Sequence, residues 1–437
     1  MLEAGGTRIL LDPILETPFS VNCYPFPKVS FDTQAIRLEK FDAVFISHYH
    51  DDHCSFDPEM LDLIRELGFK EVHSLTLNAE VCIGDFSITP RRALDAEVDS
   101  ILQINVQLTA EDSAAISSLK ILNVVDSWID DETLELLITE GPWDLILWPF
   151  QTMLEIDALS PQRAQAPSRT LPPEWIAQIA ALNPRFIVPS SCQFIQEDWS
   201  WQRQRYFPIS YAQFETEMVN LARTSNFSAK TLRLNPGTSI ELSPKAMKDS
   251  APLSWIQPIG DQNVDYTFDL NAPTDSIAEI SKRLGPLTQK QQDRVSSFCR
   301  EELAARYSEL ECVEPYFDQP RRWQLDVYDS AGQLEKFHYL VKGNELTPQG
   351  SVETPGQPEW ITEIPASKLF NALENGEALN SLYIRINDTR FSARVEQEFE
   401  ETEADLLNDP LLRVLYEGKF GTYQKAQLRK LKAKNEV

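Results

Sequence analysis

Residues 47–53 read Ser-His-Tyr-His-Asp-Asp-His and hold three of the five histidines of the chain. The residues directly before them, Phe-Asp-Ala-Val-Phe-Ile-Ser at 41–47, are typical of a buried strand. We therefore expect the histidines in the loop that follows that strand. Because His48 and His50 are two positions apart, an extended loop places both imidazoles on the same side. Asp52 and His53 follow at once and could serve a second cation.

This cluster combines neutral imidazoles with carboxylates, the ligand types that suit zinc, iron and manganese. The alternative is a chance histidine cluster in a solvated loop. The spacing, the preceding strand and the acidic residues favour a site for one or two divalent metal ions. These ions could be zinc, or else iron or manganese.

The overall charge restricts the partners. The chain has 437 residues, with 67 acidic and 40 basic side chains and a net charge of −27. Such a surface repels nucleic acid and anionic membranes, so we expect neither as a partner and predict a small-molecule substrate. An anionic substrate would need a local positive patch or a metal ion. Homo-oligomer formation is left open.

The cysteines and the hydropathy predict a cytoplasmic protein. Six cysteines are scattered without a Cys-x-x-Cys pair, which is typical of reduced thiols rather than a disulfide framework. No apolar run is long enough to span a bilayer, and the N-terminus lacks the basic-then-apolar pattern of a secretion signal.

Strand and helix patterns alternate in the first half of the chain, which favours an α/β fold. The composition changes near residues 243–258, so we predict a first domain over 1–245 and an α+β accessory domain of unknown role over 255–437. The main elements expected are strands at Arg8–Pro13, Val72–Leu77, Val81–Ile88, Ala114–Ile121, Ile121–Val125, Trp143–Trp148 and Arg185–Pro189, helices at Asp131–Thr139 and Pro173–Leu182, and a hairpin of Trp323–Tyr328 with Lys336–Val341.

The 47–53 cluster, Leu11-Asp12-Pro13 and Asn123-Val124-Val125-Asp126 together resemble the metallo-β-lactamase superfamily over roughly residues 1–240. This resemblance implies an αββα sandwich with a metal site along the edge where its two sheets meet. A softer similarity, carried by passages such as Trp143-Asp144-Leu145-Ile146-Leu147, points to the branch of ascorbate-6-phosphate lactonase and CMP-N-acetylneuraminate hydroxylase.

The resemblance also implies a role for each motif residue. His48 and His50 would bind the first metal ion, Asp52 and His53 the second, and Asp126 would bridge the two. Asp52 would also handle a proton during catalysis. Asp12 would support the histidine loop by accepting hydrogen bonds. Two simpler interpretations stay open: a turn-former before Pro13 for Asp12, and a helix N-cap for Asp126.

Two histidines that the superfamily normally supplies are missing, because His73 and His338 stand at other positions. Candidate replacement ligands are Glu111 and Asp112 for the first, and Ser191 and Cys192 for the second. Carboxylates would favour iron or manganese, and a thiolate would favour zinc, although a buried inert thiol is the favoured interpretation of Cys192. The chain lacks the Cys-x-His and Cys-x-x-His pairs of a Rieske centre, so the hydroxylase chemistry of that branch is not transferred.

The leading hypothesis is therefore a metal-dependent hydrolase of a small ester, lactone or phosphate-containing compound. A metal ion lowers the pKa of a bound water from 15.7 towards about 7, which makes a metal-bound hydroxide available at neutral pH. Arg203 and Arg205 are candidates for holding an anionic substrate, or else belong to a solvated helix face. The alternatives are a degenerate binding or scaffolding protein with weak or no catalysis, and a non-haem iron enzyme that uses oxygen.

Overall fold

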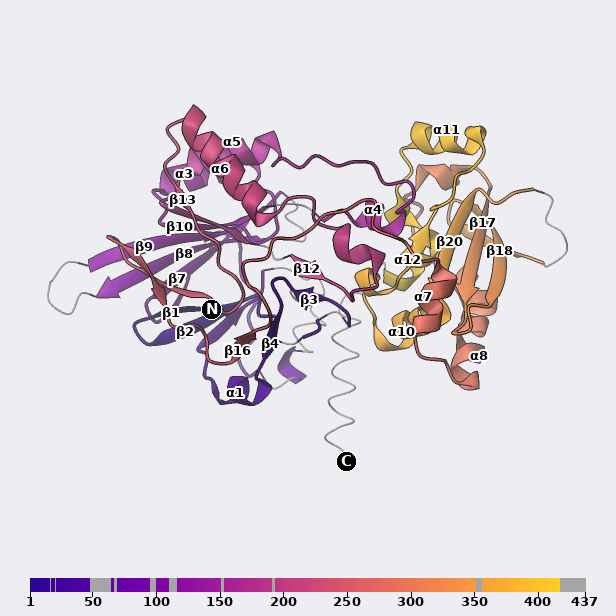
Figure 1. Cartoon of the computed structure of the whole chain (residues 1–437), viewed down its shortest axis with the longest axis horizontal. Helices are drawn as coiled ribbons and strands as arrows, with labels where there is room; N and C mark the ends of the chain where they lie inside the picture. The colour runs from indigo at the N-terminus through magenta and orange to yellow at the C-terminus, as the bar shows by residue number, and fades with distance from the viewer. Residues whose placement is uncertain are drawn as a thin grey trace. The chain divides into compact units, whose positions relative to one another are not determined.

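The structure, a computed structural model, describes residues 1–15, 17–19, 21–47, 64–66, 69–94, 100–109, 116–150, 153–190, 193–350 and 356–416. Helices and strands are mixed throughout, so the chain is α/β (Figure 1). It forms two compact units. Unit 1 comprises Met1–Met153, Pro167–Asp198 and Phe207–Phe268, and unit 2 comprises Leu154–Ala166, Trp199–Tyr206 and Asp269–Val437. Both units are discontinuous, whereas the ranges predicted from the sequence, 1–245 and 255–437, are continuous.

Unit 1 contains a small sheet near the N-terminus. Its order is β1-β2-β5, formed by Leu2–Ala4, Thr7–Leu11 and Ala43–Phe45. Strands β1 and β2 are antiparallel and joined by a turn at Gly5 and Gly6, which both have positive φ angles. Strands β2 and β5 are parallel, with Leu11 opposite Phe45. Their carboxyl ends therefore lie at the same edge.

A larger mixed sheet forms the rest of the framework of unit 1. In the described part of the chain its order is β13-β11-β10-β9-β8-β7-β6. Strands β9, β10, β11 and β13 are parallel, and β9, β8, β7 and β6 are antiparallel in succession. The strands are Val81–Ile83 (β6), Phe86–Arg92 (β7), Ser100–Thr109 (β8), Ile116–Asn123 (β9), Leu145–Pro149 (β10), Phe186–Ser190 (β11) and Lys230–Thr231 (β13).

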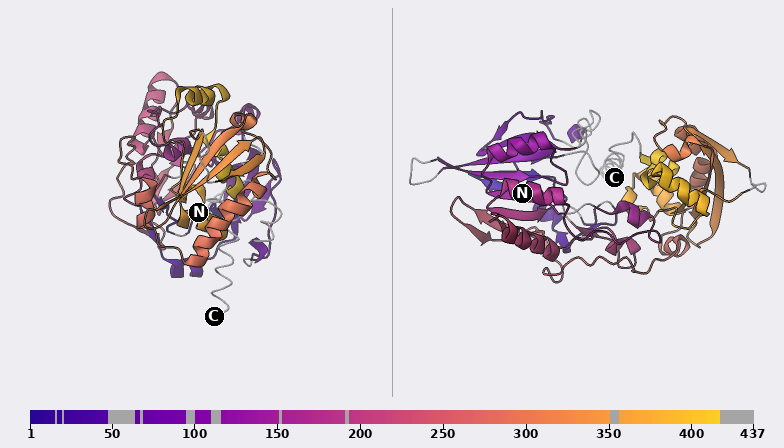
Figure 2. Two further views of the ribbon diagram at one scale, coloured as in Figure 1. Left: turned by 90° about the vertical axis from the view of Figure 1, so that its right-hand side faces the viewer. Right: turned by 90° about the horizontal axis from the view of Figure 1, so that it is seen from above.

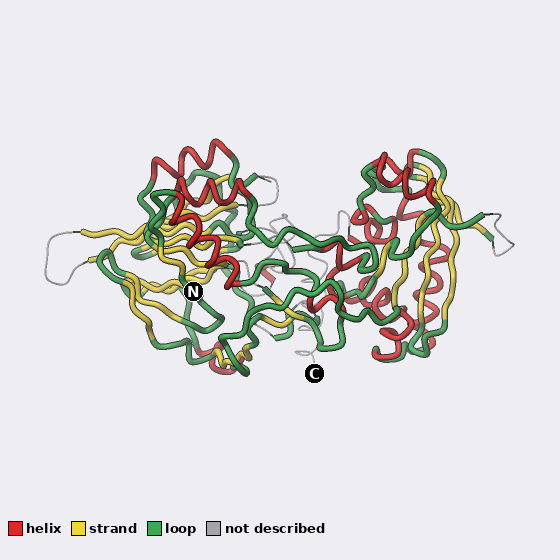
Figure 3. The backbone as a smooth tube through the Cα atoms, turned by 45° about the horizontal axis from the view of Figure 1, so that its top comes forward, coloured by secondary structure: helices red, strands yellow, loops and turns green. Residues whose placement is uncertain are grey.

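Two apolar clusters hold unit 1 together. One cluster joins the two sheets, because it contains Ile9 and Phe45 of the small sheet and Ile88, Leu102 and Ile104 of the large one. The other lies between the large sheet and helices α3 (Asp131–Glu140), α5 (Pro173–Leu182) and α6 (Tyr211–Thr224) (Figure 3). The large sheet is thus buried on both faces, which leaves its strand ends as the place for polar groups.

Shorter elements complete unit 1. Residues near the N-terminus pair with strands far along the chain, β3 with β12 and β4 with β16. These pairs join the segment between β2 and β5 to residues later in the sequence of unit 1. The bounds are Tyr24–Pro25 (β3), Val29–Phe31 (β4), Thr33–Leu38 (α1), Phe194–Ile195 (β12), Ser239–Leu242 (β14), Met247–Ser250 (β15) and Ile256–Pro258 (β16).

Unit 2 is built on a five-stranded sheet of described residues with the order β19-β18-β17-β20-β21 (Figure 2). One face of this sheet packs against α8, α9, α10 and α12 through the apolar core of the unit. Helix α7 packs against the other face, where it forms a smaller apolar cluster with Trp201 and Tyr383. The bounds are Arg321–Tyr328 (β17), Leu334–Lys342 (β18), Glu345–Gln349 (β19), Trp360–Pro365 (β20), Arg385–Ile386 (β21), Glu155–Leu159 (α4), Ile277–Arg283 (α7), Gln289–Ser297 (α8), Leu303–Tyr307 (α9), Ala366–Asn375 (α10), Ala393–Thr402 (α11) and Pro410–Tyr416 (α12).

The predicted elements agree with the structure in most places, with three corrections. Helix α5 has the predicted bounds, and β17 and β18 form the predicted hairpin. Residues 72–77 form no strand, because most of this segment is exposed and has no sheet partner. The two strands predicted at 114–125 are one strand, β9. The ten-residue strand β8 was not predicted. None of the helices among the described residues is long and apolar enough to cross a membrane.

Candidate metal centre

Asp12 connects the ends of the two parallel strands of the small sheet. Its backbone N–H donates to the carbonyl of Phe45 at 2.9 Å. Its carboxylate oxygen Oδ1 accepts a hydrogen bond from the backbone N–H of Ser47 at 2.7 Å. Ser47 is the residue before His48, so Asp12 makes the kind of contact that a support for the histidine loop requires.

Ser47 is also held from the large sheet. Its carbonyl accepts a hydrogen bond from the hydroxyl of Ser100 at 2.8 Å. Ser47 is buried, and Ser100 begins strand β8. Both backbone groups of Ser47 are therefore fixed, one by each sheet. The sequence analysis did not identify Ser100, because it did not identify the strand that carries it.

Asp126 lies at this same edge. Strands β8 and β9 are antiparallel, with Leu102 opposite Asn123, so continuing the register places Ser100 opposite Val125. Asp126 follows directly and is exposed. The register thus brings Asp126 to the strand ends where Ser100 holds the backbone that leads into His48.

The backbone has an unusual conformation at both strand ends. Asp12 has φ +41° and Val125 has φ +61°. A β-branched residue rarely adopts positive φ, at a cost of order 1–3 kcal/mol, and such residues cluster at functional sites. The side chain of Asn123 steadies the turn by accepting a hydrogen bond from the N–H of Val125 at 3.2 Å.

The structure excludes the helix-cap interpretation of Asp126. Helix α3 begins at Asp131, and its N-cap is Asp130, whose side chain accepts from the N–H of Thr133. Asp126 precedes the cap by four residues. Its position is set by the end of β9 rather than by the need to cap a helix.

Most of the predicted ligands lie outside the described residues: His48, His50, Asp52, His53, Glu111, Asp112, Ser191 and Cys192. Within the described ranges, no group of three or more His, Cys, Asp or Glu side chains could hold a metal ion. Ser190, which precedes Ser191, ends β11, and β11 runs parallel to β10 and β9. The chain therefore leaves β11 towards the edge that carries Asp126.

The described residues nearest in the sequence to Glu111 and Asp112 are Thr109 and Ile116. Thr109 and Ile116 pair with each other at the end of β8 and β9 opposite to Asn123. From Ile116 to Asn123 strand β9 spans about 23 Å. The predicted role of Glu111 and Asp112 as ligands stays a prediction.

The described residues on either side of positions 95–99, Leu94 and Ser100, are both held at the Asp126 edge. Leu94 donates its backbone N–H to the carbonyl of Trp128 at 2.8 Å, and Ser100 bonds to Ser47. Between Leu94 and Ser100 the sequence carries Asp95, Glu97 and Asp99, which lie outside the described residues. These carboxylates were not identified from the sequence, because β8 was not predicted and the loop before it was therefore not recognised.

Arg205, predicted to bind substrate, is a packing residue of unit 2. It is only 3% exposed, and its guanidinium donates to the carbonyls of Pro161, Leu270 and Ala272 at 3.2, 2.6 and 3.3 Å. Burial lowers the pKa of this guanidinium. These contacts fasten three segments together. Arg203 lies in the same short helical turn of unit 2, and its predicted substrate role stays a prediction.

The two remaining histidines lie in different units. His73 is exposed in an irregular segment of unit 1, and His338 lies on β18 of unit 2. Among the described cysteines, Cys23 and Cys299 are buried, Cys82 and Cys312 are exposed, and all four are free thiols.

Neither a family model nor a curated protein matches the sequence. Some solved structures are similar to parts of the chain. CmlA, described as a diiron β-hydroxylase from Streptomyces venezuelae, is 16% identical over 53% of this chain, with a TM-score of 0.34. A variant of CmlA is 16% identical over 53% of this chain, with a TM-score of 0.36. YhfI from Bacillus subtilis, described as a metallo-β-lactamase fold protein, is 14% identical over 45% of this chain and 75% of its own, with a TM-score of 0.27.

The chain spans about half the length of the CmlA structures that it matches, 50% in each case. With TM-scores of 0.36 or less, these likenesses do not establish a common fold. Membership of the metallo-β-lactamase superfamily is therefore a proposal that rests on the residues of the chain.

Proposed function

We propose that unit 1 is a metallo-β-lactamase-like αββα sandwich and that the protein is a metal-dependent hydrolase of a small ester, lactone or phosphate-containing compound. One observation carries this proposal. The backbone of Ser47, which leads into His48, is fixed by Asp12 from one sheet and by Ser100 from the other. The same strand ends present Asp126. A backbone held this firmly directly before His48, beside a carboxylate, suits a metal centre.

The residues present fit a divalent cation. His48, His50, Asp52, His53 and Asp126 would hold it, with nitrogen and oxygen donors suited to zinc, iron or manganese. A bound cation supplies Lewis acidity and lowers the pKa of a coordinated water. The protein's own contribution is to fix the ligands. Asp12 and Ser100 do this by holding the backbone before His48. Asn123 does it by stabilising the turn at Val125 that leads into Asp126.

Asp52 would accept and release the proton during hydrolysis. Removing a general base costs roughly 10²–10⁴-fold in rate. Asp51 is the adjacent residue in the sequence and carries the same charge, so Asp51→Asn is a matched control for Asp52→Asn. Lactones are among the proposed substrates because the sequence has a softer similarity to the lactonase branch.

The test is a hydrolysis assay on a panel of esters, lactones and phosphoesters, after loading with zinc, manganese or ferrous iron. We expect turnover that Asp52→Asn reduces by at least about a hundredfold and that Asp51→Asn changes little. Absence of turnover with every metal would support the degenerate binding protein instead. Oxygen consumption by the iron-loaded protein, without hydrolysis, would support the non-haem iron enzyme.

A further inference from the structure

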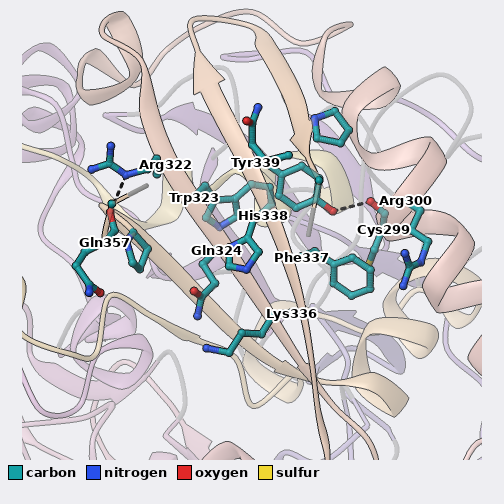
Figure 4. Close-up of a pocket in the computed structure, with 15 residues that line it drawn as sticks. Cys299, Arg300, Arg322, Trp323, Gln324, Lys336, Phe337, His338, Tyr339 and Gln357 are labelled. Atoms are coloured by element: carbon teal, nitrogen blue, oxygen red, sulfur yellow. Dashed lines mark hydrogen bonds between the residues drawn. The ribbon is translucent and has the colours of Figure 1, made fainter. Parts of the chain in front are cut away.

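Unit 2 contains a hollow on its sheet that has no part in the proposed metal chemistry. The hollow has a volume of about 860 Å³ and lies around the adjacent strands β17 and β18 (Figure 4). This volume is within the range of small-molecule sites, roughly 300–1,000 Å³.

The strand register explains why polar side chains line this hollow. Residues two apart in a strand share a face, and Gln324 lies opposite His338. Arg322, Gln324, Lys336 and His338 therefore share one face of β17 and β18. Their neighbours Trp323 and Tyr339 belong to the apolar core. Figure 4 shows Gln324 beside His338, with Lys336 close by and Arg322 next to Gln357.

The charge of the lining is opposite to that of the chain. Arg300, Arg322 and Lys336 line the hollow, and none of the described lining residues is Asp or Glu. The chain as a whole carries 67 acidic and only 40 basic residues. The side chain of Lys336 is exposed and makes no ion pair or hydrogen bond with any residue that the structure describes. Its ammonium group keeps three donors for a ligand.

The other polar groups are held in place by their surroundings. Arg322 donates through Nε to the carbonyl of Gln357 at 2.7 Å and pairs through one terminal nitrogen with Glu359 at 3.3 Å. A Cβ at Gly356 would lie 2.9 Å from Cζ of Arg322, so a larger residue there would displace the guanidinium. The contacts with Gln357 and Glu359 hold the guanidinium in place.

Gln324 hydrogen-bonds to the buried carboxylate of Asp326. It is 8% exposed, and its Nε2 donates to both oxygens of Asp326 at 2.9 and 3.0 Å. Asp326 lies opposite Lys336 in the register but is only 6% exposed. Burial raises the pKa of Asp326 and the nearby charge of Lys336 partly offsets this, so the carboxylate interacts with both the Gln324 amide and Lys336.

We propose that this hollow binds a small organic anion, a compound that carries a phosphate or carboxylate group. Lys336 and Arg322 contact the anionic oxygens, and His338 lies within the same site. Charge complementarity supports this occupant, because oxyanions bind guanidinium and ammonium donors through charge-assisted hydrogen bonds. In a protein of net charge −27, the lining offers Lys336 as a cation without an ion pair to a described residue, whereas Arg300 pairs with Glu335 at 2.6 Å and Arg322 with Glu359 at 3.3 Å.

The test is equilibrium dialysis of the full-length protein with labelled inorganic phosphate and, separately, labelled acetate. It is done in the His48→Ala/His50→Ala variant, so that the proposed metal centre does not contribute. We expect saturable binding of at least one probe, weakened about tenfold by Lys336→Gln and restored by Lys336→Arg. The matched control is Lys342→Gln, which removes the same charge from the same face of β18 and should change binding less than twofold.

Binding of phosphate alone or acetate alone identifies which oxyanion the site takes. Absence of saturable binding of both probes would overturn the proposal, and so would equal weakening by Lys336→Gln and Lys342→Gln. Lys336 and Lys342 are exposed, so neither substitution should disturb folding. Because the dialysis is independent of metal and turnover, its failure would leave the proposed hydrolase untouched.

Discussion

Asp126 in unit 1 and Asp409 in unit 2 show two different uses of a carboxylate. Asp409 is fully buried and accepts hydrogen bonds from Trp360 Nε1, Thr362 Oγ1 and the backbone N–H groups of Leu411 and Leu412. Asp126 is exposed at a strand end, beside a backbone segment that two sheets hold. A buried carboxylate that accepts four hydrogen bonds has a structural role. An exposed carboxylate beside a backbone segment fixed by two sheets is suited to binding a metal ion.

Exchanging each carboxylate for an amide separates the two uses. We expect Asp126→Asn to weaken metal binding by more than the roughly 100-fold that loss of a supporting group costs. Competition with a chelating dye measures this. Asp130→Asn is the matched control, because it removes the same charge four residues away and keeps a good helix cap. Equal metal affinity of the Asp126→Asn variant and the wild type would show that Asp126 is not a ligand.

Asp409→Asn should change stability instead. Burial raises the pKa of Asp409 from 3.8 to about 6. The folded state therefore holds the proton more tightly than the unfolded state. The resulting stabilisation is full below the unfolded pKa and is lost as the pH rises through the folded pKa.

We expect this loss to amount to about 3 kcal/mol of the free energy of unfolding between about pH 4 and pH 7. Urea unfolding at several pH values measures it. In Asp409→Asn this part of the pH dependence should disappear, while metal binding stays unchanged. An unaltered slope would mean that Asp409 is ionised in the folded protein with an ordinary pKa.

The support for the histidine loop gives the next smaller effect. Asp12→Ala removes the acceptor for the N–H of Ser47, and we expect metal affinity to fall roughly 10–100-fold. Asp12→Asn should cost less, because the amide oxygen still accepts and asparagine tolerates the positive φ of this position. If both variants bind metal like the wild type, Asp12 is only a turn-former.

Ser100→Ala gives the smallest effect of the series. The variant loses one neutral hydrogen bond to the carbonyl of Ser47, which contributes about 1 kcal/mol, so we expect about fivefold weaker metal binding. Ser100→Thr keeps the hydroxyl and should restore affinity. A deficit of the same size in Ser100→Thr would indicate that packing at the start of β8 matters rather than the hydrogen bond.

The sequence predicts the elements whose patterns are local. Helix α5 begins with Pro173 and ends before Asn183, which adopts the left-handed conformation of a helix C-cap, so its bounds follow from known end signals. The Asp12 turn and the strand before Ser47 follow from the same kind of local pattern. These features lead the sequence analysis to the candidate metal centre.

The sequence analysis overlooked one local strand pattern, and it could not predict contacts between residues far apart in the sequence. Strand β8 alternates Leu102, Ile104, Val106 and Leu108 with Gln103, Asn105 and Gln107, a pattern that does indicate a strand. Missing it had a consequence for the site. The third ligand was sought after β8, at Glu111 and Asp112, which lie outside the described residues, whereas the register places Ser100, the first residue of β8, at the Asp126 edge. The contact of Ser100 with Ser47 joins residues 53 positions apart, and no local pattern predicts it.

The most direct measurement is the metal content of the protein purified without chelators, by elemental analysis. We predict one or two divalent ions per chain in the wild type, loss of this metal in His48→Ala/His50→Ala, and retention in His73→Ala, whose histidine is exposed in an irregular segment of unit 1. A metal-free wild type that cannot be reloaded, or equal metal content in all three proteins, would contradict the metal centre at the edge of the two sheets.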